Sequence, residues 1–173
     1  MIRKHKRFSR PRKAFDITRI DEENKLVNKY GLKSKREIWK ANSRISEIRN
    51  QAKNLITASQ EEQKALIIKL NKMGFEVSMI SDILALKKED WLRRRLQSVI
   101  VDKGLAKTPK AARQLIAHKH IAISENIVNI PSYVVPVDEE DKITLVRMKT
   151  IEMRKKEKKE KVNKPEGEEE NGS

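Results

Sequence analysis

The chain has 173 residues, and 40 Lys and Arg against 25 Asp and Glu give it a formal net charge of +15. This length suits one compact body or two small ones, and the surplus charge favours a polyanionic partner over most small-molecule substrates. Aromatic residues make up only 4%, so base stacking is not expected to be the main source of affinity, and the absence of cysteine excludes disulfides and thiolate metal sites. No apolar run is long enough for a transmembrane helix, so we expect no membrane partner and, by default, a cytosolic or nuclear protein.

Residues 1–15 form a basic arm without a single acidic residue. Pro11 breaks any helix there, and like charges at this density repel one another. We therefore expect an extended segment that is free in solution and ordered on a phosphate surface. The alternative is a solvated tail that binds nothing specific. The cations of the arm are Arg3, Lys4, Lys6, Arg7, Arg10, Arg12 and Lys13.

Residues 16–86 have the pattern of an all-helical bundle. The first predicted helix spans 16–32 and ends at Gly31, which suits a left-handed C-terminal position. Two shorter helices are predicted from a capping box at Ser59 to Gly74 and over 78–86. The residues expected to face inward on these two helices are Leu66, Leu70, Met73, Met79, Ile80, Ile83 and Leu84.

A long helix is predicted between these elements, from a capping box formed by Ser34 and Glu37 to about Thr57. Its apolar residues recur at spacings of three and four, so it packs along one narrow stripe. On another face, cations recur every fourth residue, which suits a helix lying between a core and RNA phosphates; a solvated charged face is an equally compatible interpretation. The stripe consists of Ile38, Ala41, Ile45, Ile48, Ala52 and Leu55, and the cations are Arg36, Lys40 and Arg44.

A single helix is predicted over 88–102, with three consecutive arginines mostly off its core face. The next helix begins with Thr108 as its N-cap and Pro109 at its first position. The free N–H groups at that N-terminus favour an anion. Gln114 and His118 are candidates for hydrogen bonds to RNA sugars, the alternatives being a surface polar residue and a helix C-terminal cap. The cations clustered around these helices are Arg93, Arg94, Arg95, Lys103, Lys107, Lys110, Arg113 and Lys119.

The hydrophobic period changes after His120. β-Branched residues over 121–130 predict a hairpin with its turn at Glu125-Asn126, extended by Val134-Val135, and 143–148 is the last predicted strand. The four acids over 138–141 are expected to form a solvated loop rather than a metal site. From about Lys149 the chain is a low-complexity charged tail, which we expect to be disordered.

The segment from Arg94 to Val135 resembles the S-four RNA-binding domain, a small α/β module with a basic, phosphate-binding surface. Residues 22–56 are similar to the helical half of the archaeal and eukaryotic type of small-subunit ribosomal protein S-four. Two departures stand out, because Lys119 replaces a turn glycine of that family and residues 124–126 replace a glycine-rich strand turn. The residues that match the domain are Arg95-Leu96, Gly104-Leu105-Ala106, Thr108, Ala112-Arg113-Gln114-Leu115-Ile116, His118, His120-Ile121, Ile123, Val128 and Pro131-Ser132-Tyr133.

The resemblance implies an α+β protein: a basic arm (1–15), a helical ribosomal-RNA-binding domain (16–92), an S-four domain of two helices on a short antiparallel sheet (93–148), and a charged tail (149–173). In that family the S-four domain is inserted into the helical domain. The implied function is a structural constituent of the small ribosomal subunit that binds folded ribosomal RNA early in assembly. It also implies a place near the side where messenger RNA enters, a role in translational accuracy, and neighbouring ribosomal proteins such as the S-five family.

Two alternatives stay open: a ribosome-biogenesis factor, and an RNA-modifying enzyme that uses the S-four domain as a tether. The sequence has no catalytic motif, so we expect no enzyme activity, no cofactor, no metal and no small-molecule substrate. The predicted RNA-binding residues are Arg3, Lys4, Lys6, Arg7, Arg10, Arg12, Lys13, Arg36, Lys40, Arg44, Arg93, Arg94, Arg95, Lys103, Lys107, Thr108, Lys110, Arg113, Gln114, His118, Lys119 and His120.

Overall fold

The computed structural model describes residues 8–146. Predictions for Arg3, Lys4, Lys6 and Arg7, for the charged tail and for the last two residues of the final strand lie outside this range. Within it, helices and strands follow in the order α1 (Ile17–Tyr30), α2 (Lys35–Asn54), α3 (Gln60–Lys72), α4 (Ile80–Ala85), α5 (Lys88–Arg93), α6 (Leu96–Asp102), α7 (Pro109–Ala117), β1 (Ile121–Ile123), β2 (Asn126–Ile127), α8 (Val137–Glu140) and β3 (Ile143–Leu145).

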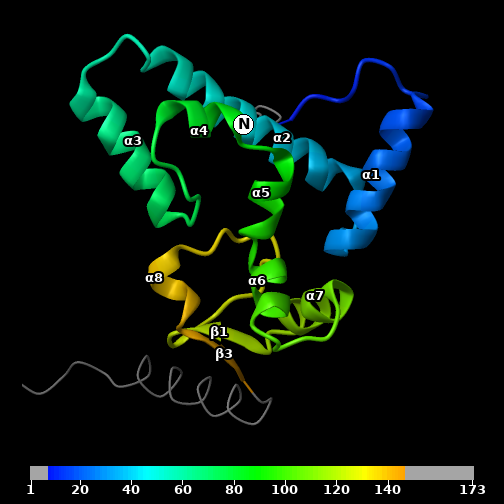
Figure 1. The fold of residues 1–173 in the computed structure, drawn as a ribbon. Coiled ribbons are helices and arrows are strands. Elements are labelled where there is room, and N and C mark those ends of the chain that lie inside the picture. The colour runs from blue at the N-terminus through cyan, green and yellow to red at the C-terminus, as the bar shows by residue number, and fades with distance from the viewer. Residues whose placement is uncertain (1–7, 147–173) are drawn as a thin grey trace, which may run out of the picture.

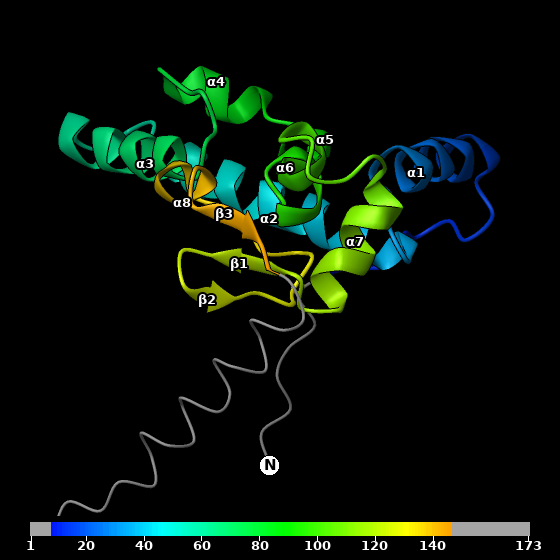
Figure 2. The same cartoon turned by 90° about the horizontal axis from the view of Figure 1, so that it is seen from below.

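The long helix α2 joins two groups of helices. Figure 1 shows α1 near one end of α2 and α3 near the other, with α4 and α5 alongside it. Helix α5 leads into an α/β unit in which α6 and α7 cover a small sheet (Figures 1 and 2). The molecule is therefore a helical layer with an α/β unit attached through one short helix.

Among residues 8–146 there are four apolar clusters, and the three largest hold these parts together. One lies between α1 and the first half of α2, one between the second half of α2 and helices α3 and α4, and the third lies inside the α/β unit. Trp91 of α5 packs against both helical clusters. The predicted stripe of α2 is confirmed, since Ile38, Ala41, Ile45 and Ala52 are buried. Met79 is 66% exposed, against prediction, because α4 begins only after it.

Two helix ends follow the sequence and one does not. Gly31 ends α1 with φ +58°, and a Cβ atom there would lie 2.9 Å from Pro109 at the start of α7. The side chain of Ser59 caps α3 as predicted. The capping box at Ser34 is wrong: Ser34 makes no side-chain cap, and Oε1 of Glu37 accepts instead from the backbone N–H of Lys33 at 3.1 Å.

The single helix predicted over 88–102 is also wrong, because it breaks between α5 and α6. At the break, Arg95 pairs in antiparallel fashion with Val134. The N–H of Leu96 donates to the carbonyl of Tyr133 at 2.7 Å, and the N–H of Val135 donates to the carbonyl of Arg94 at 3.1 Å. Val134 and Val135 therefore pair with this break rather than extending the sheet.

The sheet is antiparallel with the order β2-β1-β3. Its hairpin turn lies at Ser124-Glu125, one residue before the predicted turn, and Ser124 takes φ +55°. Lys119 takes φ +64° at the position where the resembling family has glycine. A side chain there is held in a conformation that L-residues adopt at a cost of about 1–2 kcal/mol.

The acidic segment before β3 forms the short helix α8 instead of a solvated loop. Glu140 pairs with Arg94 at 2.9 Å, and Asp141 pairs with Lys103 at 3.1 Å. The hydroxyl of Tyr133 donates to Glu139 at 2.7 Å, and this hydrogen bond, with burial, raises the pKa of Tyr133 to about 12. Two of these acids therefore pair with cations of the fold, and a third accepts a hydrogen bond from a tyrosine hydroxyl.

Candidate nucleic-acid interface

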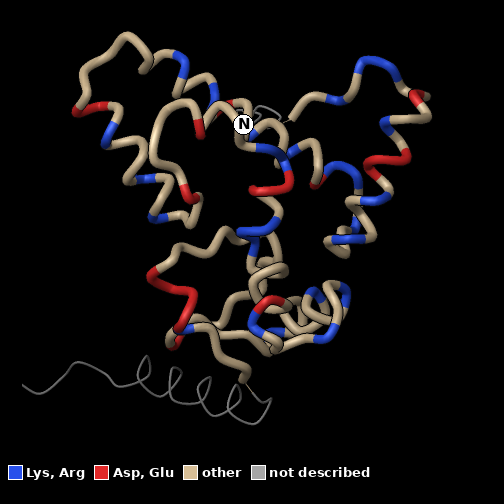
Figure 3. The backbone as a smooth tube through the Cα atoms, viewed as in Figure 1, with Lys and Arg blue, Asp and Glu red and all other residues tan. Residues whose placement is uncertain are grey.

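The cations predicted on α2 line an open groove of about 630 Å³ between α2 and the α/β unit. Arg36, Lys40 and Arg44 contribute from α2, while Arg95 and Arg113 contribute from the opposite side. Figure 3 shows basic residues along α2 and around α7. Among the described residues that line the groove, Glu37 is the one acid beside five cations, so the local charge of the groove is positive.

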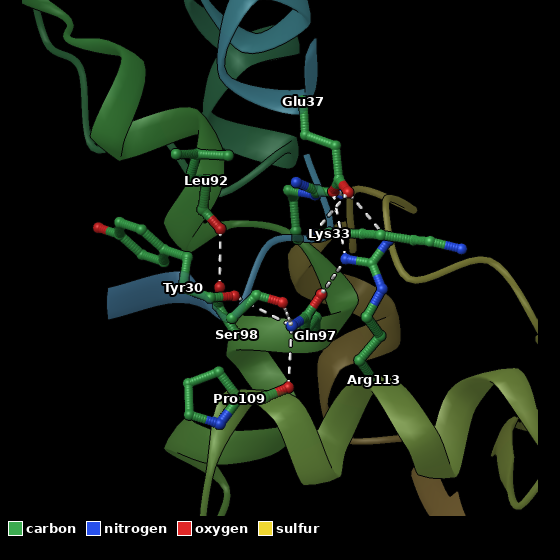
Figure 4. A network of polar contacts seen from close by, with 10 residues as sticks. Tyr30, Lys33, Glu37, Leu92, Gln97, Ser98, Pro109 and Arg113 are labelled. Carbon is green, nitrogen blue, oxygen red and sulfur yellow. Dashed lines mark hydrogen bonds and ion pairs between the residues drawn. The ribbon is translucent and has the colours of Figure 1, made fainter. Parts of the chain in front are cut away.

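Glu37 joins the two walls of this groove through arginines (Figure 4). Its Oε2 accepts from Nη2 of Arg95 at 2.6 Å, and its Oε1 accepts from Nη2 of Arg113 at 2.9 Å. Glu37 lies on α2, Arg95 precedes α6 and Arg113 lies on α7. One carboxylate thus ties the helical layer to the α/β unit with charge-assisted hydrogen bonds.

Gln97 extends this network and is 2% exposed. Its Nε2 lies within hydrogen-bond distance of three carbonyl oxygens, those of Tyr30 and Gly31 at 3.0 Å and that of Pro109 at 2.8 Å. Its Oε1 accepts from Nη1 of Arg113 at 3.3 Å. The end of α1 and the start of α7 are therefore fixed to one buried amide, whose polar atoms are satisfied.

The electrostatic state of Glu37 follows from this geometry. Burial by itself raises the pKa of this carboxyl, but hydrogen bonds from Arg113 and Arg95 and their positive charges outweigh burial. The pKa of Glu37 therefore lies below its ordinary value of 4.5, and the group is ionised at neutral pH. The junction, defined as Glu37, Arg95, Gln97 and Arg113, is a salt-bridged joint rather than a free anion site.

The three consecutive arginines have different surroundings. Arg93 is exposed, as predicted. Arg94 donates to the carbonyls of Met73 at 3.1 Å and Val135 at 3.0 Å, and Arg95 is only 5% exposed. The prediction that all three lie mostly off the core is wrong for Arg94 and Arg95, because the break between α5 and α6 turns both inward. Their contact with RNA stays a prediction.

A second basic surface surrounds α7. Lys107, Lys110 and Lys119 are exposed at its two ends, and Gln114 is exposed on it. The hydroxyl of Thr108 accepts from the N–H of Ala111 at 3.2 Å, which confirms the predicted cap. The rings of His118 and His120 lie at the other end with centroids 6.4 Å apart. Lys103, also predicted to bind RNA, is ion-paired with Asp141.

Sequence reasoning missed a buried acid in the helical layer. Glu23 is 4% exposed and accepts from Nε1 of Trp39 at 2.9 Å and from Nη1 of Arg19 at 3.1 Å. Lys35 also lies 3.7 Å from it. Helical periodicity could have marked this residue, since Glu23 lies three residues before Leu26, four before Val27 and seven before Tyr30, on the apolar face of α1.

Residues 8–146 contain no cluster of three or more His, Cys, Asp or Glu residues placed to hold a metal ion. In the same part of the chain, no helix is long and apolar enough to span a bilayer.

The fold and its basic faces define a protein built around an RNA-binding module. The family model of the S4 domain matches residues 94–141, which contain the break before α6, both helices, the hairpin and α8. The chain is similar to "Small ribosomal subunit protein uS4" from Methanococcus aeolicus, at 44% identity over 146 residues, covering 80% of this chain and 82% of that protein.

Two further relatives carry the same name. The protein from Korarchaeum cryptofilum is 38% identical over 160 residues, covering 89% of this chain and 96% of its own. One from Saccharolobus islandicus is 44% identical over 145 residues, covering 80% of each chain. The chain belongs to the uS4 family of small ribosomal subunit proteins.

Proposed function

We propose that this protein is a structural constituent of the small ribosomal subunit and binds folded small-subunit ribosomal RNA. The observation that carries the proposal is the groove, whose cations come from both the helical layer and the S4 domain. The family membership supports the same conclusion. In this proposal the protein acts on the ribosome in the cytoplasm, beside other small-subunit proteins, and has no catalytic role.

The groove favours recognition of RNA by shape. Arg36, Lys40 and Arg44 are spaced by four residues, so they follow one face of α2 about 6 Å apart along its axis. Each phosphate that they neutralise releases counterions, which makes the affinity depend on salt. The junction of Glu37, Arg95, Gln97 and Arg113 holds the opposite wall at a fixed angle. A folded RNA of matching shape therefore contacts both walls without any base being read.

The surface around α7 is the second contact in this proposal. Lys107 and Lys110 flank the N-terminus of the helix, where free backbone N–H groups attract an anion. Lys119 and His118 lie at the other end, close to the hairpin. We propose that this face binds a different segment of the same RNA, so that the protein fixes the relative orientation of two RNA elements. The family resemblance adds the side where messenger RNA enters as its place on the subunit.

The test compares binding to a folded 5′ fragment of archaeal small-subunit ribosomal RNA with binding to duplex RNA of equal length, across a salt series. We expect tighter binding to the fragment that survives salt better. Replacing Arg36, Lys40 and Arg44 with Ala should reduce the log–log salt slope by roughly 2 to 3, at about 0.7–0.9 per contact. The matched control replaces Lys64, Lys69 and Lys72, which are exposed on α3, and removes the same charge.

Equal losses in the two triple variants would contradict the groove as the binding surface. Presence in mature small subunits separates a constituent from a biogenesis factor, which would be found only in precursor particles. Sedimentation of tagged protein from cells, followed by detection across the subunit fractions, measures this directly.

A further inference from the structure

Residues 8–15 form a short strap that runs from beside α2 to the start of α1. It is the dark blue segment before α1 in Figure 1. At one end, the ring of Phe8 packs beside Trp39, with centroids 6.1 Å apart. At the other end, Nη2 of Arg19 donates to the carbonyl oxygens of Lys13 at 2.8 Å and Ala14 at 3.0 Å. The predicted arm that is free in solution is therefore wrong for this part of it.

The residues that hold the two ends of the strap, Trp39 and Arg19, both donate hydrogen bonds to the same buried carboxylate. Glu23 accepts from Trp39, which packs on Phe8, and from Arg19, which holds the other end. Asp16 fixes the step into α1, because its Oδ1 accepts from Oγ1 of Thr18 at 2.8 Å and caps the backbone N–H of Arg19. The backbone on both sides of Phe15 is thus held in place before any ligand arrives.

Phe15 projects from this fixed position and is 92% exposed. Its ring gains no burial in the free protein, whereas a rigid support lowers the entropy lost when a partner covers it. Arg10, Arg12 and Lys13, just before it, are exposed as well. A partner that fits this arrangement presents an apolar flat face together with adjacent negative charge.

We propose that Phe15 is a stacking site for an unpaired base of small-subunit ribosomal RNA, with Arg12 and Lys13 on the neighbouring phosphates. An unpaired nucleotide supplies both features, since every base has a π-face and lies between phosphates. This inference rests on the proposed function and specifies the RNA feature that the strap recognises. With few aromatics in the chain, one stacking contact fixes register on the RNA while the cations supply most of the affinity.

The experiment measures binding of the full chain to the folded 5′ fragment of archaeal small-subunit ribosomal RNA. Phe15→Ala should weaken binding by about 5- to 100-fold, with Phe15→Trp within about twofold of the wild type and Phe15→Leu close to the Ala variant. The salt slope should not change, because no phosphate contact is removed. Phe15→Ala should also unfold at the wild-type temperature, because the ring is exposed.

Ile17, which is 74% exposed and two residues away, provides the matched apolar control. Ile17→Ala should bind like the wild type. Chemical probing of the RNA should show a nucleotide that is reactive in the free fragment, protected by the wild type and reactive again with Phe15→Ala. Such a nucleotide supports the stacking site.

Other results would overturn the proposal in distinguishable ways. If Phe15→Ala binds the fragment as tightly as the wild type does, and the wild type still prefers the fragment over duplex RNA, the Phe15 site alone is overturned. Wild-type affinity of Phe15→Leu, or an equal loss in Ile17→Ala, would indicate apolar contact without stacking. Loss of any preference of the wild type for the fragment would overturn both the Phe15 site and the proposed function.

Discussion

The two walls of the groove use positive charge in opposite ways. On α2, Arg36 and Lys40 are exposed, whereas on the other wall Arg95 is 5% exposed and bound to Glu37. The cations of the first wall are accessible to a ligand, whereas those of the second wall form ion pairs that join α2 to the S4 domain. The total of 40 Lys and Arg therefore overstates the number of phosphate contacts, because some of the arginines are bound within the fold.

Among the variants that test this difference between the walls, Arg95→Ala should lower the free energy of unfolding the most. Removing one partner of a buried ion pair leaves Glu37 with less compensation, and such losses are typically about 3–5 kcal/mol in the free energy of unfolding. Urea denaturation measures it, with the exposed Arg93→Ala as the control, expected within about 0.5 kcal/mol of the wild type. Similar small losses in both variants would show that the junction does not stabilise the fold.

Glu37→Gln should have the next largest effect, and its sign depends on pH. The folded-state pKa of Glu37 is lowered, so its ionised form contributes stability above its ordinary value of 4.5, and this contribution is lost as pH falls through the folded-state pKa. At pH 7 we expect a loss of about 1.5–3 kcal/mol, the usual range for hydrogen bonds to charged groups.

The measurement for Glu37→Gln is the free energy of unfolding between pH 7 and pH 3, with Glu76→Gln as an exposed control. The gap between the wild type and Glu37→Gln should narrow at acid pH, because the wild-type carboxyl becomes neutral as well. A gap that is constant over this range would mean that the charge of Glu37 is not what holds the junction.

Arg93→Ala should change binding rather than folding. It is the exposed member of the arginine triplet, so its removal should lower the log–log salt slope for RNA by about 0.7–0.9. Comparison with Arg95→Ala, measured as binding per folded molecule, separates a phosphate ligand from a structural arginine. An unchanged salt slope would show that Arg93 does not contact RNA phosphates.

Lys119→Gly should give the smallest effect and, unlike the others, a favourable one. Lys119 takes φ +64°, which glycine adopts freely, so the free energy of unfolding should rise by about 0.5–1 kcal/mol after allowing for the entropy of glycine. Thermal unfolding checks this. RNA binding should weaken in the same variant if Lys119 contacts phosphate, so the two measurements together show whether the strain supports function.

Much of the fold was predictable because local rules decide it. The stripe from Ile38 to Ala52 was found from its spacing, and the ends at Gly31, Ser59 and Thr108 were found from capping chemistry. The exposed cations of α2 and α7 also followed from their position opposite apolar residues. These features involve neighbours in sequence, which periodicity and capping describe well.

The features that were missed depend on distant partners. The break at Arg95 requires Val134, and the role of Glu37 requires Arg113, which lies on α7. A pattern that predicts a capping box cannot show that the carboxylate has two guanidinium groups within reach. The turn was misplaced by one residue because the pairing of β1 with β3 also constrains its register.

The sequence by itself therefore determined the helical layer, the S4-type module and a surplus of positive charge directed at an anionic partner. Only the tertiary structure decided which cations remain exposed, because a carboxylate inside the fold binds the arginines that packing places beside it. Glu37 and Glu23 do this beside the first turns of α2, Glu37 fixing the S4 domain and Glu23 fixing the strap that presents Phe15.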